Sequence, residues 1–227
     1  MALAFITGGS RGLGYATAKG LKDKGFELVI FSKQSDRLQS AAAELGAHYE
    51  VVDLEDLPRT SEVFKSAVEK YGVPDVLMLA HGVMSDRMAK TLKTNLSEWR
   101  RVMAINLDSV FVIVNLVGAA MAEARKGRII IYSACLGRMS GPGNAGGLAP
   151  YRISKAGVNA LVRNLSHEVG HGARGLWVDA ICPNHSRTDM GGPDAPRSAD
   201  EGAETAIWLA TRELTPGATQ TGLLWED

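Results

Sequence analysis

Seven short apolar runs alternate along the chain with longer segments of helical pattern, and this alternation restricts the fold more than any other feature. The runs are apolar throughout, as expected for strands that helices cover on both faces. The strands are expected at Leu3–Thr7, Glu27–Phe31, His48–Val52, Val76–Ala80, Arg128–Ser133, Leu176–Cys182 and Gly222–Trp225. The helices are expected at Gly12–Lys24, Asp36–Leu45, Pro58–Tyr71, Ser97–Ala124, Tyr151–Gly170 and Ala199–Thr211. This order predicts one doubly wound α/β domain over residues 1–227, with a seven-stranded, mostly parallel sheet between two helical layers.

Composition narrows the classes of protein that fit. A chain of 227 residues has the length expected for one domain with a single hydrophobic core. Its 25 basic and 25 acidic side chains balance, and the basic ones do not cluster into a face that would bind nucleic acid. The apolar start Met1–Ile6 is short and is expected to be a buried strand, not a signal peptide. No apolar run approaches the roughly 20 residues that span a bilayer, so no membrane segment is expected. Cys135 and Cys182 end apolar runs and are expected to be reduced, which favours a cytoplasmic location.

A glycine-rich turn joins the first expected strand to the first expected helix. Glycines allow a tight turn, and the helix N-terminus offers free N–H donors to a pyrophosphate. The turn reads Thr7-Gly8-Gly9-Ser10-Arg11-Gly12-Leu13-Gly14. Its place between strand and helix predicts a Rossmann-type dinucleotide site contacted by Gly8, Ser10, Arg11, Gly12, Leu13 and Gly14. The alternative is a glycine-rich turn that binds no ligand.

The end of the second expected strand indicates which dinucleotide binds. An NAD site usually places a carboxylate there for the ribose 2′-hydroxyl, but this strand ends Phe31-Ser32-Lys33-Gln34. Lys33 and Arg11 are positioned to face a 2′-phosphate, and Ser32 can donate a hydrogen bond to it. The cofactor is therefore predicted to be NADP(H). The alternative is that both cations only solvate the surface.

Tyr151 and Lys155 lie four residues apart, which places them on one face of the expected helix. A free tyrosine has a pKa of about 10, so work near neutral pH calls for a pKa lower by roughly 2–3 units. A nearby ammonium group stabilises the phenolate, and Lys155 is expected to lower the pKa of Tyr151 in this way. The pair is therefore predicted to act as a proton donor and acceptor.

Taken together and in this order, these motifs resemble the short-chain dehydrogenase/reductase family over nearly the full length. The matching landmarks are Thr7–Gly14, Asp53, Ala80-His81-Gly82, Asn106, Ser133, Tyr151 with Lys155, and Pro183 through Thr188-Asp189-Met190. The segment Arg187–Pro193, continuing into Glu201–Thr205, resembles the carbonyl-reductase branch of that family.

The resemblance implies a role for each landmark. Tyr151 would protonate a carbonyl oxygen as hydride arrives, Lys155 would lower its pKa and bind the nicotinamide ribose, and Asn106 would hold a water in a proton relay. The further cofactor contacts that it implies are Asp53 and Leu54 beside adenine, Ala80 and Gly82 in the cleft, and Pro183, Ser186 and Thr188 after the sixth strand. It also implies a homodimer or homotetramer and no metal.

The sequence departs from the family at the end of the fifth strand. The family shows Ser-Ser-x-x-Gly, with the second serine polarising the substrate carbonyl, but this chain reads Ser133-Ala134-Cys135-Leu136-Gly137. Either Ser133 supplies the catalytic hydroxyl through a small shift of register, or the hydroxyl is missing. Adjacent strand residues point to opposite faces, which counts against a simple exchange. A missing donor of this kind lowers the rate by roughly 10²–10³-fold.

Two loops and one helix carry further histidines. Ala80-His81-Gly82 stands where the family shows Asn-Ala-Gly, and Pro183-Asn184-His185-Ser186 stands where it shows Pro-Gly. His185 is expected to face solvent, with a hydrogen bond to substrate as the alternative. His167 and His171 have a spacing that can bind metal, but with no third ligand they are expected to lie on an exposed helix face.

The predicted function is NADPH-dependent reduction of a ketone, aldehyde or quinone to an alcohol, or the reverse oxidation, with Tyr151 as acid or base. The first alternative is a catalytically impaired NADP(H)-binding sensor or scaffold protein. The second alternative is a lyase, dehydratase or epimerase that uses the same site. The Gly- and Pro-rich segment after the sixth strand leaves little room for lid helices and predicts an open pocket for a small-molecule carbonyl or alcohol.

Overall fold

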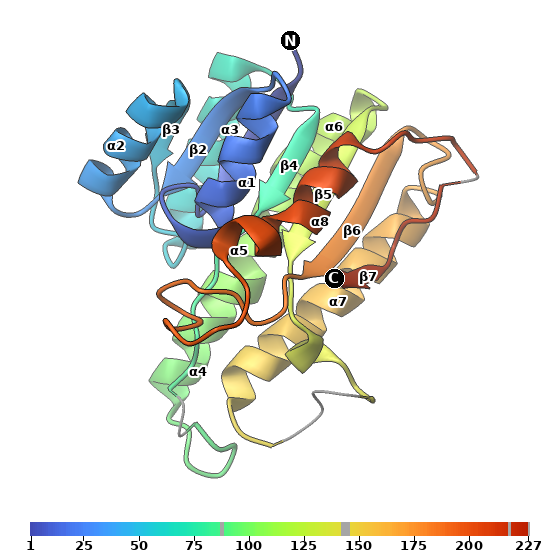
Figure 1. Ribbon diagram of the computed structural model, residues 1–227. Coiled ribbons are helices and arrows are strands. Elements are labelled where there is room, and N and C mark those ends of the chain that lie inside the picture. Colours follow the sequence, from blue (N-terminus) through green and yellow to red (C-terminus); the bar gives the residue numbers. More distant parts are fainter. Residues whose placement is uncertain (87–88, 142–145, 218, 227) are drawn as a thin grey trace.

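The computed structural model describes residues 1–86, 89–141, 146–217 and 219–226. A single sheet runs through the molecule in the order β3-β2-β1-β4-β5-β6-β7, and each pairing between its strands is parallel (Figure 1). Its strands are β1 Leu3–Thr7, β2 Glu27–Ser32, β3 His48–Val51, β4 Val76–Leu79, β5 Gly127–Tyr132, β6 Leu176–Cys182 and β7 Leu224–Glu226. The predicted seven-stranded sheet is confirmed, and it is parallel throughout where a mostly parallel sheet was expected.

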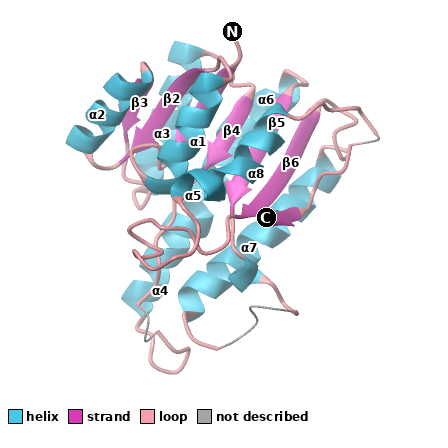
Figure 2. Cartoon of the chain, in the orientation of Figure 1, coloured by secondary structure: helices cyan, strands magenta, loops and turns pink. Residues whose placement is uncertain are grey.

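Helices cover both faces of the sheet, as predicted (Figure 2). The helices are α1 Gly12–Asp23, α2 Ser35–Leu45, α3 Leu57–Tyr71, α4 Leu96–Met103, α5 Ser109–Ile113, α6 Ala119–Glu123, α7 Ala149–Glu168 and α8 Ala199–Thr211. Helices α1, α2 and α8 pack on one face, and α3, α4 to α6 and α7 pack on the other. Side chains alternate between the two layers along each strand, so Phe5 enters one core and Ile6 the other.

The helix predicted at Ser97–Ala124 is a continuous run from Leu96 to Glu123. It contains two five-residue π turns, Ala104–Asp108 and Val114–Gly118, which separate α4, α5 and α6. Asn95 begins it, since its side chain accepts a hydrogen bond from the Glu98 N–H. Single π turns of this kind are frequent at functional sites, and the first one holds Asn106.

The same run, alone among the helices of the described residues, has the length and apolar composition of a membrane-spanning helix. No apolar run of this length was expected from the sequence, so the expectation was wrong for this helix on length and composition. Val110, Ile113, Val117 and Met121 on this helix are buried against the sheet. Core packing therefore accounts for its apolar composition.

Helix α7 starts two residues earlier than predicted, at Ala149. Pro150 occupies the first turn, where its missing N–H leaves no hydrogen bond unmade, and this favours an early start. The preceding Leu148 adopts a left-handed backbone conformation with φ of 52°. Tyr151 therefore lies within the first turn of α7, facing the carboxyl end of the sheet.

The strand order reverses between β1 and β4, because the chain builds outward from β1 through β2 to β3 and then returns beside β1. In open parallel sheets, ligands bind in the crevice that such a reversal leaves at the carboxyl ends of the strands. A cavity of about 1480 Å³ lies at this edge and is lined by the loops that follow β1, β2, β4, β5 and β6.

Candidate active site

The glycine-rich turn after β1 has the backbone geometry that its sequence predicts. Gly8 and Gly12 adopt φ of 67° and 54°, in the left-handed region that L side chains rarely enter. A Cβ on Gly14 would lie 2.3 Å from the carbonyl oxygen of Gly8, so only glycine lets α1 begin so close to the turn. Ser10 bonds across the cleft to Ser32, with 2.9 Å between the two hydroxyl oxygens. These residues fit the phosphates of a dinucleotide cofactor.

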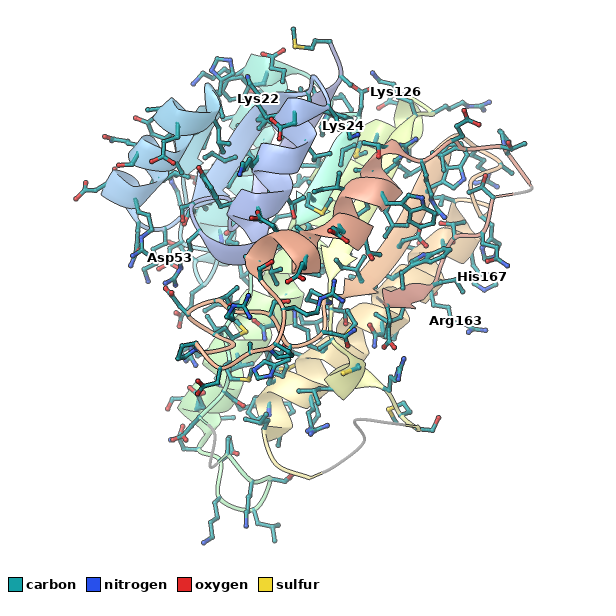
Figure 3. All side chains as sticks on the ribbon, in the orientation of Figure 1. Lys22, Lys24, Asp53, Lys126, Arg163 and His167 are labelled. Atoms are coloured by element: carbon teal, nitrogen blue, oxygen red, sulfur yellow. The ribbon has the colours of Figure 1, made fainter. Side chains whose placement is uncertain are left out.

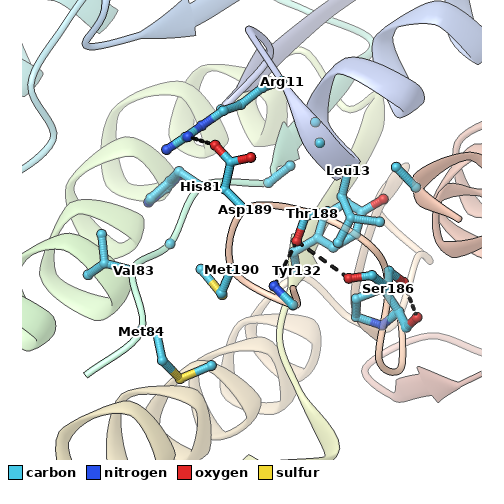
Figure 4. Close-up of a pocket in the computed structure, with 18 of the residues that line it drawn as sticks. Arg11, Leu13, His81, Val83, Met84, Tyr132, Ser186, Thr188, Asp189 and Met190 are labelled. Atoms are coloured by element: carbon cyan, nitrogen blue, oxygen red, sulfur yellow. Dashed lines mark hydrogen bonds and ion pairs between the residues drawn. The ribbon is translucent and has the colours of Figure 1, made fainter. Parts of the chain in front are cut away.

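Three cations lie close to the turns that follow β1 and β2, and carboxylates pair with all of them. Arg11 forms an ion pair with Asp189, which comes from the segment after β6 (Figure 4). Arg37 on α2 lies 3.6 Å from the same carboxylate, and Lys33 lies 2.6 Å from Asp53. The hydrogen bond from Lys33 to Asp53 raises the pKa of Lys33. Burial raises the pKa of Asp53, but the Lys33 ammonium and the Glu55 N–H outweigh burial and lower it overall. The sequence analysis missed Arg37, because its place beside Arg11 depends on how α2 packs.

Asn106 connects three elements behind the cavity. Its side-chain oxygen accepts from the Val83 N–H at 2.8 Å, and its amide nitrogen donates to the Val83 carbonyl at 2.9 Å and to the Ser154 hydroxyl at 3.1 Å. The side chain is fully buried. Asn106 therefore fixes the loop after β4 and helix α7 relative to each other, and it acts on the site through these neighbours.

Lys155 points from α7 toward the end of β5. Its ammonium donates to the Tyr132 carbonyl at 2.7 Å and lies 5.9 Å from the centre of the Tyr151 ring. A Cβ on Gly82 would lie 3.5 Å from this ammonium and from the Asn106 oxygen, so the three predicted residues meet around one point. Burial lowers the pKa of Lys155 to about 8.

The pKa of Tyr151 differs from the expectation. A lowered pKa was expected from the sequence, but burial raises the pKa of Tyr151, and the negative charge that Cys182 and Cys135 carry when ionised raises it further. The side chain is only 7% exposed, and the Lys155 ammonium donates instead to a backbone carbonyl. Tyr151 therefore keeps its proton through neutral pH, which suits an acid that gives a proton to a carbonyl oxygen.

If Tyr151 donates a proton in the reaction, as the sequence predicts, this arrangement also predicts how the rate depends on pH. Because the pKa of Lys155 is about 8, its charge is present below that pH and is lost as the pH rises through it. The ammonium would stabilise a tyrosinate left by proton transfer from Tyr151, so kcat/KM for NADPH is expected to be level below about pH 8 and to fall above it. A pH–rate profile measures this, since kcat/KM reports groups of the free enzyme. A profile that stays level through pH 9 would contradict the assignment.

Ser133 does not offer its hydroxyl to the cavity in the way that the prediction requires. The hydroxyl donates to Asn159 Oδ1 at 2.5 Å and lies 3.3 Å from the Lys155 carbonyl oxygen, so it is bound to α7. The sheet register continues past β5, because the Ser133 N–H donates to the Ile181 carbonyl at 2.7 Å. In this register the Ser133 hydroxyl is engaged by Asn159 on α7. The contacts of Ser133 favour the alternative, in which Ala134 lines the cavity and the polarising hydroxyl is missing.

The predicted cofactor residues all line the one cavity, and Ser133 lines it as well. Some of them have structural roles that the sequence did not reveal. The Ser186 hydroxyl donates to the Pro183 carbonyl at 2.9 Å, and Thr188 accepts from the Gly191 N–H at 3.1 Å (Figure 4). These bonds shape the segment after β6. Asn106 is the predicted residue that lies outside the cavity lining.

His81 occupies the position that the sequence marked as unusual after β4. Its ring nitrogens lie 2.6 Å from the Thr7 hydroxyl and 2.9 Å from the Ser109 hydroxyl. Burial lowers its pKa to about 3, with a further contribution from Lys155, so the ring is neutral. His81 thereby connects β1 to α5 beside the cavity (Figure 4).

His185 also lines the cavity, so its predicted alternative role as a hydrogen-bond partner of the substrate stays open. The His185 ring lies 2.7 Å from the Gly191 carbonyl oxygen, and the side chain is exposed, as the preferred interpretation expected. His167 lies near the end of α7 (Figure 3), and its ring lies 3.0 Å from that of His171. Both are exposed as expected, but His171 lies in the turn after α7, with a left-handed φ of 49°, and not on the helix. In the part of the chain that the structure describes, no group of three or more His, Cys, Asp or Glu side chains is arranged to hold a metal ion.

Comparison with known proteins agrees with this geometry. The model of the short chain dehydrogenase family matches residues 2–199. The chain belongs to this family. It is 30% identical over 194 residues to a 3-oxoacyl-[acyl-carrier-protein] reductase of Synechocystis sp., covering 83% of this chain and 75% of the relative. It is 31% identical over 190 residues to the 3-oxoacyl-[acyl-carrier-protein] reductase FabG of Escherichia coli K12, with the same coverage.

Among solved structures, this short-chain dehydrogenase resembles the crystal structure of ribose-5-phosphate isomerase from Brucella melitensis 16M. The TM-score is 0.86 and the identity 26%, over 100% of this chain and 90% of that one. The sequence relatives above are named as acyl-carrier-protein reductases, so the predicted likeness to the carbonyl-reductase branch is not confirmed. Proteins with different names share this fold, so the fold alone does not determine the reaction, which has to be inferred from the residues of the site.

Proposed function

We propose that this short-chain dehydrogenase is an NADPH-dependent reductase of a ketone, with Tyr151 as the proton donor. The observation that carries the proposal is the meeting of a phosphate-binding turn, Tyr151 and Lys155 in one cavity. A sensor or scaffold would need the turn, but it would have little use for a tyrosine beside a buried lysine.

NADP(H) is favoured over NAD(H) by the charges at the adenine end. No carboxylate follows β2 directly, while Arg11, Lys33 and Arg37 surround the place that a 2′-phosphate would take. Each cation now pairs with an acidic side chain, so a phosphate would compete with Asp189 and Asp53 for them. The nicotinamide cofactor would supply hydride when bound, and the protein orients its reactive ring.

The chain's own residues would carry the proton. Tyr151 would donate its hydroxyl proton to the carbonyl oxygen as negative charge develops there, and the Lys155 ammonium would stabilise the phenolate left behind. Asn106 would hold α7 in place through Ser154, so that Tyr151 keeps its position. Ala134 would leave the carbonyl oxygen without the hydroxyl donor that the family supplies, and the reaction would be correspondingly slower.

A 3-oxoacyl thioester is the substrate class that we favour over an aldehyde or a quinone, because the relatives are named as 3-oxoacyl reductases. The cavity lining includes apolar side chains that are suited to an acyl chain. Met84, Ile105, Leu136, Leu148 and Met190 line it.

The decisive experiment follows NADPH oxidation by the purified protein with a 3-oxoacyl thioester, a diketone and a quinone in parallel. Turnover that is fastest with the thioester supports the full proposal. Turnover only with the quinone or the diketone would support the reductase activity but would contradict the 3-oxoacyl thioester as its substrate class. Tight NADPH binding with no turnover on any of them favours the sensor or scaffold alternative.

The charge arrangement predicts a cofactor preference that mutation would reverse. Arg11→Ala is expected to raise the Kd for NADPH by about 10–100-fold, since a hydrogen bond to a charged group contributes roughly 1.5–3 kcal/mol. The Kd for NADH is expected to change much less, because NADH lacks the 2′-phosphate. Titration of both cofactors against the variant measures this, with Lys24→Ala at the far end of α1 as a control. Equal weakening for NADPH and NADH would place Arg11 at the pyrophosphate instead.

We also propose a homodimer or homotetramer in the cytoplasm. Phe111 on α5 and Ile153 on α7 are 54% and 43% exposed, which is unusual for large apolar side chains on neighbouring helices and is consistent with a covered face. Both cysteines are free thiols, as a reducing compartment would leave them. Light scattering of the purified chain tests the oligomer.

A further inference from the structure

Two thiols meet in the wall of the cavity, beside Tyr151. Cys182 is the last residue of β6, and Cys135 begins the short 3-10 turn Cys135–Gly137 that follows β5. The Cys135 N–H donates to the Cys182 sulfur at 3.0 Å, and the Cys182 thiol lies 3.8 Å from the Asn184 side-chain oxygen. The proton transfer proposed above uses neither of them.

The backbone around the pair is suited to a disulfide. A disulfide joins Cα atoms roughly 4.4–6.8 Å apart, so the two backbones have to come close together. The register pairs Tyr132 with Ile181, and the Cys135 backbone, three residues further on, reaches the Cys182 sulfur through its N–H. The 3.0 Å contact between the Cys135 N–H and the Cys182 sulfur shows that the chain after β5 passes directly against this thiol.

The two sulfurs differ in their access to the cavity. Both residues line it, but Cys182 is buried while Cys135 is half-buried. Burial raises the pKa of Cys182 to about 11, so its thiol stays protonated near neutral pH. Because the thiolate is the nucleophile, the more exposed Cys135 is the sulfur that would meet a small oxidant first.

We propose that Cys135 and Cys182 form a dithiol oxidation site that a hydroperoxide converts to a disulfide. The Cys135 sulfur attacks the O–O bond and becomes a sulfenic acid, releasing water from hydrogen peroxide or an alcohol from an organic hydroperoxide. The Cys182 sulfur then attacks the sulfenic sulfur, the S–S bond forms and water leaves. The two thiols lose two electrons and two protons in total, and these reduce the hydroperoxide.

The pair is coupled mechanically to the catalytic helix. The turn that starts at Cys135 packs so closely on α7 that a Cβ on Gly137 would lie 2.5 Å from the Lys155 carbonyl carbon. Drawing Cys135 toward β6 would therefore move a turn that has no free space beside Lys155. Oxidation is expected to lower reductase turnover, a consequence that rests on the proposed function, whereas the thiol chemistry does not.

The test treats the purified full-length protein with hydrogen peroxide and follows thiols by titration and peptides by mass spectrometry. We expect both thiols to disappear, a peptide linking Cys135 to Cys182 within one chain, and recovery with dithiothreitol. In Cys182→Ser, Cys135 is expected to stop at a sulfenic acid that dimedone traps. In Cys135→Ser, Cys182 is expected to stay a thiol at peroxide concentrations that oxidise the wild type.

Three results would overturn the proposal: thiols that survive while methionines oxidise, a disulfide formed only between chains, or a Cys182 that reacts equally fast without Cys135. None of these measurements requires turnover. The dithiol proposal can therefore be tested even if the protein reduces none of the carbonyl substrates. Circular dichroism of each variant confirms that the fold is kept.

Discussion

Replacing Ala134 with serine is expected to raise kcat for carbonyl reduction by about 10²–10³-fold, the usual effect of one preorganised donor to a developing oxyanion. Ala134 lines the cavity in an extended backbone conformation, with φ of −158° and ψ of 149°, that serine also adopts. The neighbouring Ser133 cannot supply the same bond while its hydroxyl is held by Asn159. The gain is expected in kcat more than in KM, because the bond strengthens as charge develops on the oxygen.

The measurement is steady-state NADPH oxidation by the wild type, by Ala134→Ser and by Ala43→Ser, an equivalent change on the exposed surface of α2. A rate in Ala134→Ser that matches the other two proteins would show that the site already has a donor at that position. A companion Ser133→Ala variant would then identify the donor, since a loss of more than tenfold there would return the role to Ser133 by a local rearrangement.

The fold could be predicted because its determinants are local and periodic. Apolar runs of strand length separated by helical patterns leave few arrangements, and the turn at Gly8 and Gly14 has backbone and packing demands that only glycine meets. The residues at which helices begin and end are harder to predict from the sequence than the order of the elements. The start of α7 at Ala149 depends on Pro150, which the pattern of apolar residues does not register.

The site could be predicted as a set of residues but not as a set of contacts. The predicted cofactor residues share one cavity, since strand ends of a parallel sheet meet at one edge. The direction in which Ser133 bonds, the pairing of Arg37 with Asp189 and the meeting of Cys135 with Cys182 all depend on neighbours distant in sequence. The raised pKa of Tyr151 has the same origin, because burial is a tertiary property.

Tyr151→Phe is expected to lower kcat/KM for carbonyl reduction by about 10²–10⁴-fold, the usual contribution of a positioned acid. The change removes one oxygen and keeps the ring that packs at the start of α7, so the fold and the cavity shape are expected to persist. NADPH binding is therefore expected to stay close to that of the wild type, because the phosphate-binding turn and Arg11 lie at the other end of the cavity.

The assay compares Tyr151→Phe with Tyr49→Phe, the same change at an exposed tyrosine on β3, and measures NADPH affinity alongside turnover. A loss of turnover with unchanged affinity separates the acid from the binding site. A Tyr151→Phe variant within about tenfold of the wild type would mean that another group protonates the product, and the half-buried Cys135 thiol beside it would become the first candidate. Weakened NADPH binding in the same variant would instead indicate that the tyrosine hydroxyl mainly holds the cofactor, which is the outcome that a sensor or scaffold protein predicts.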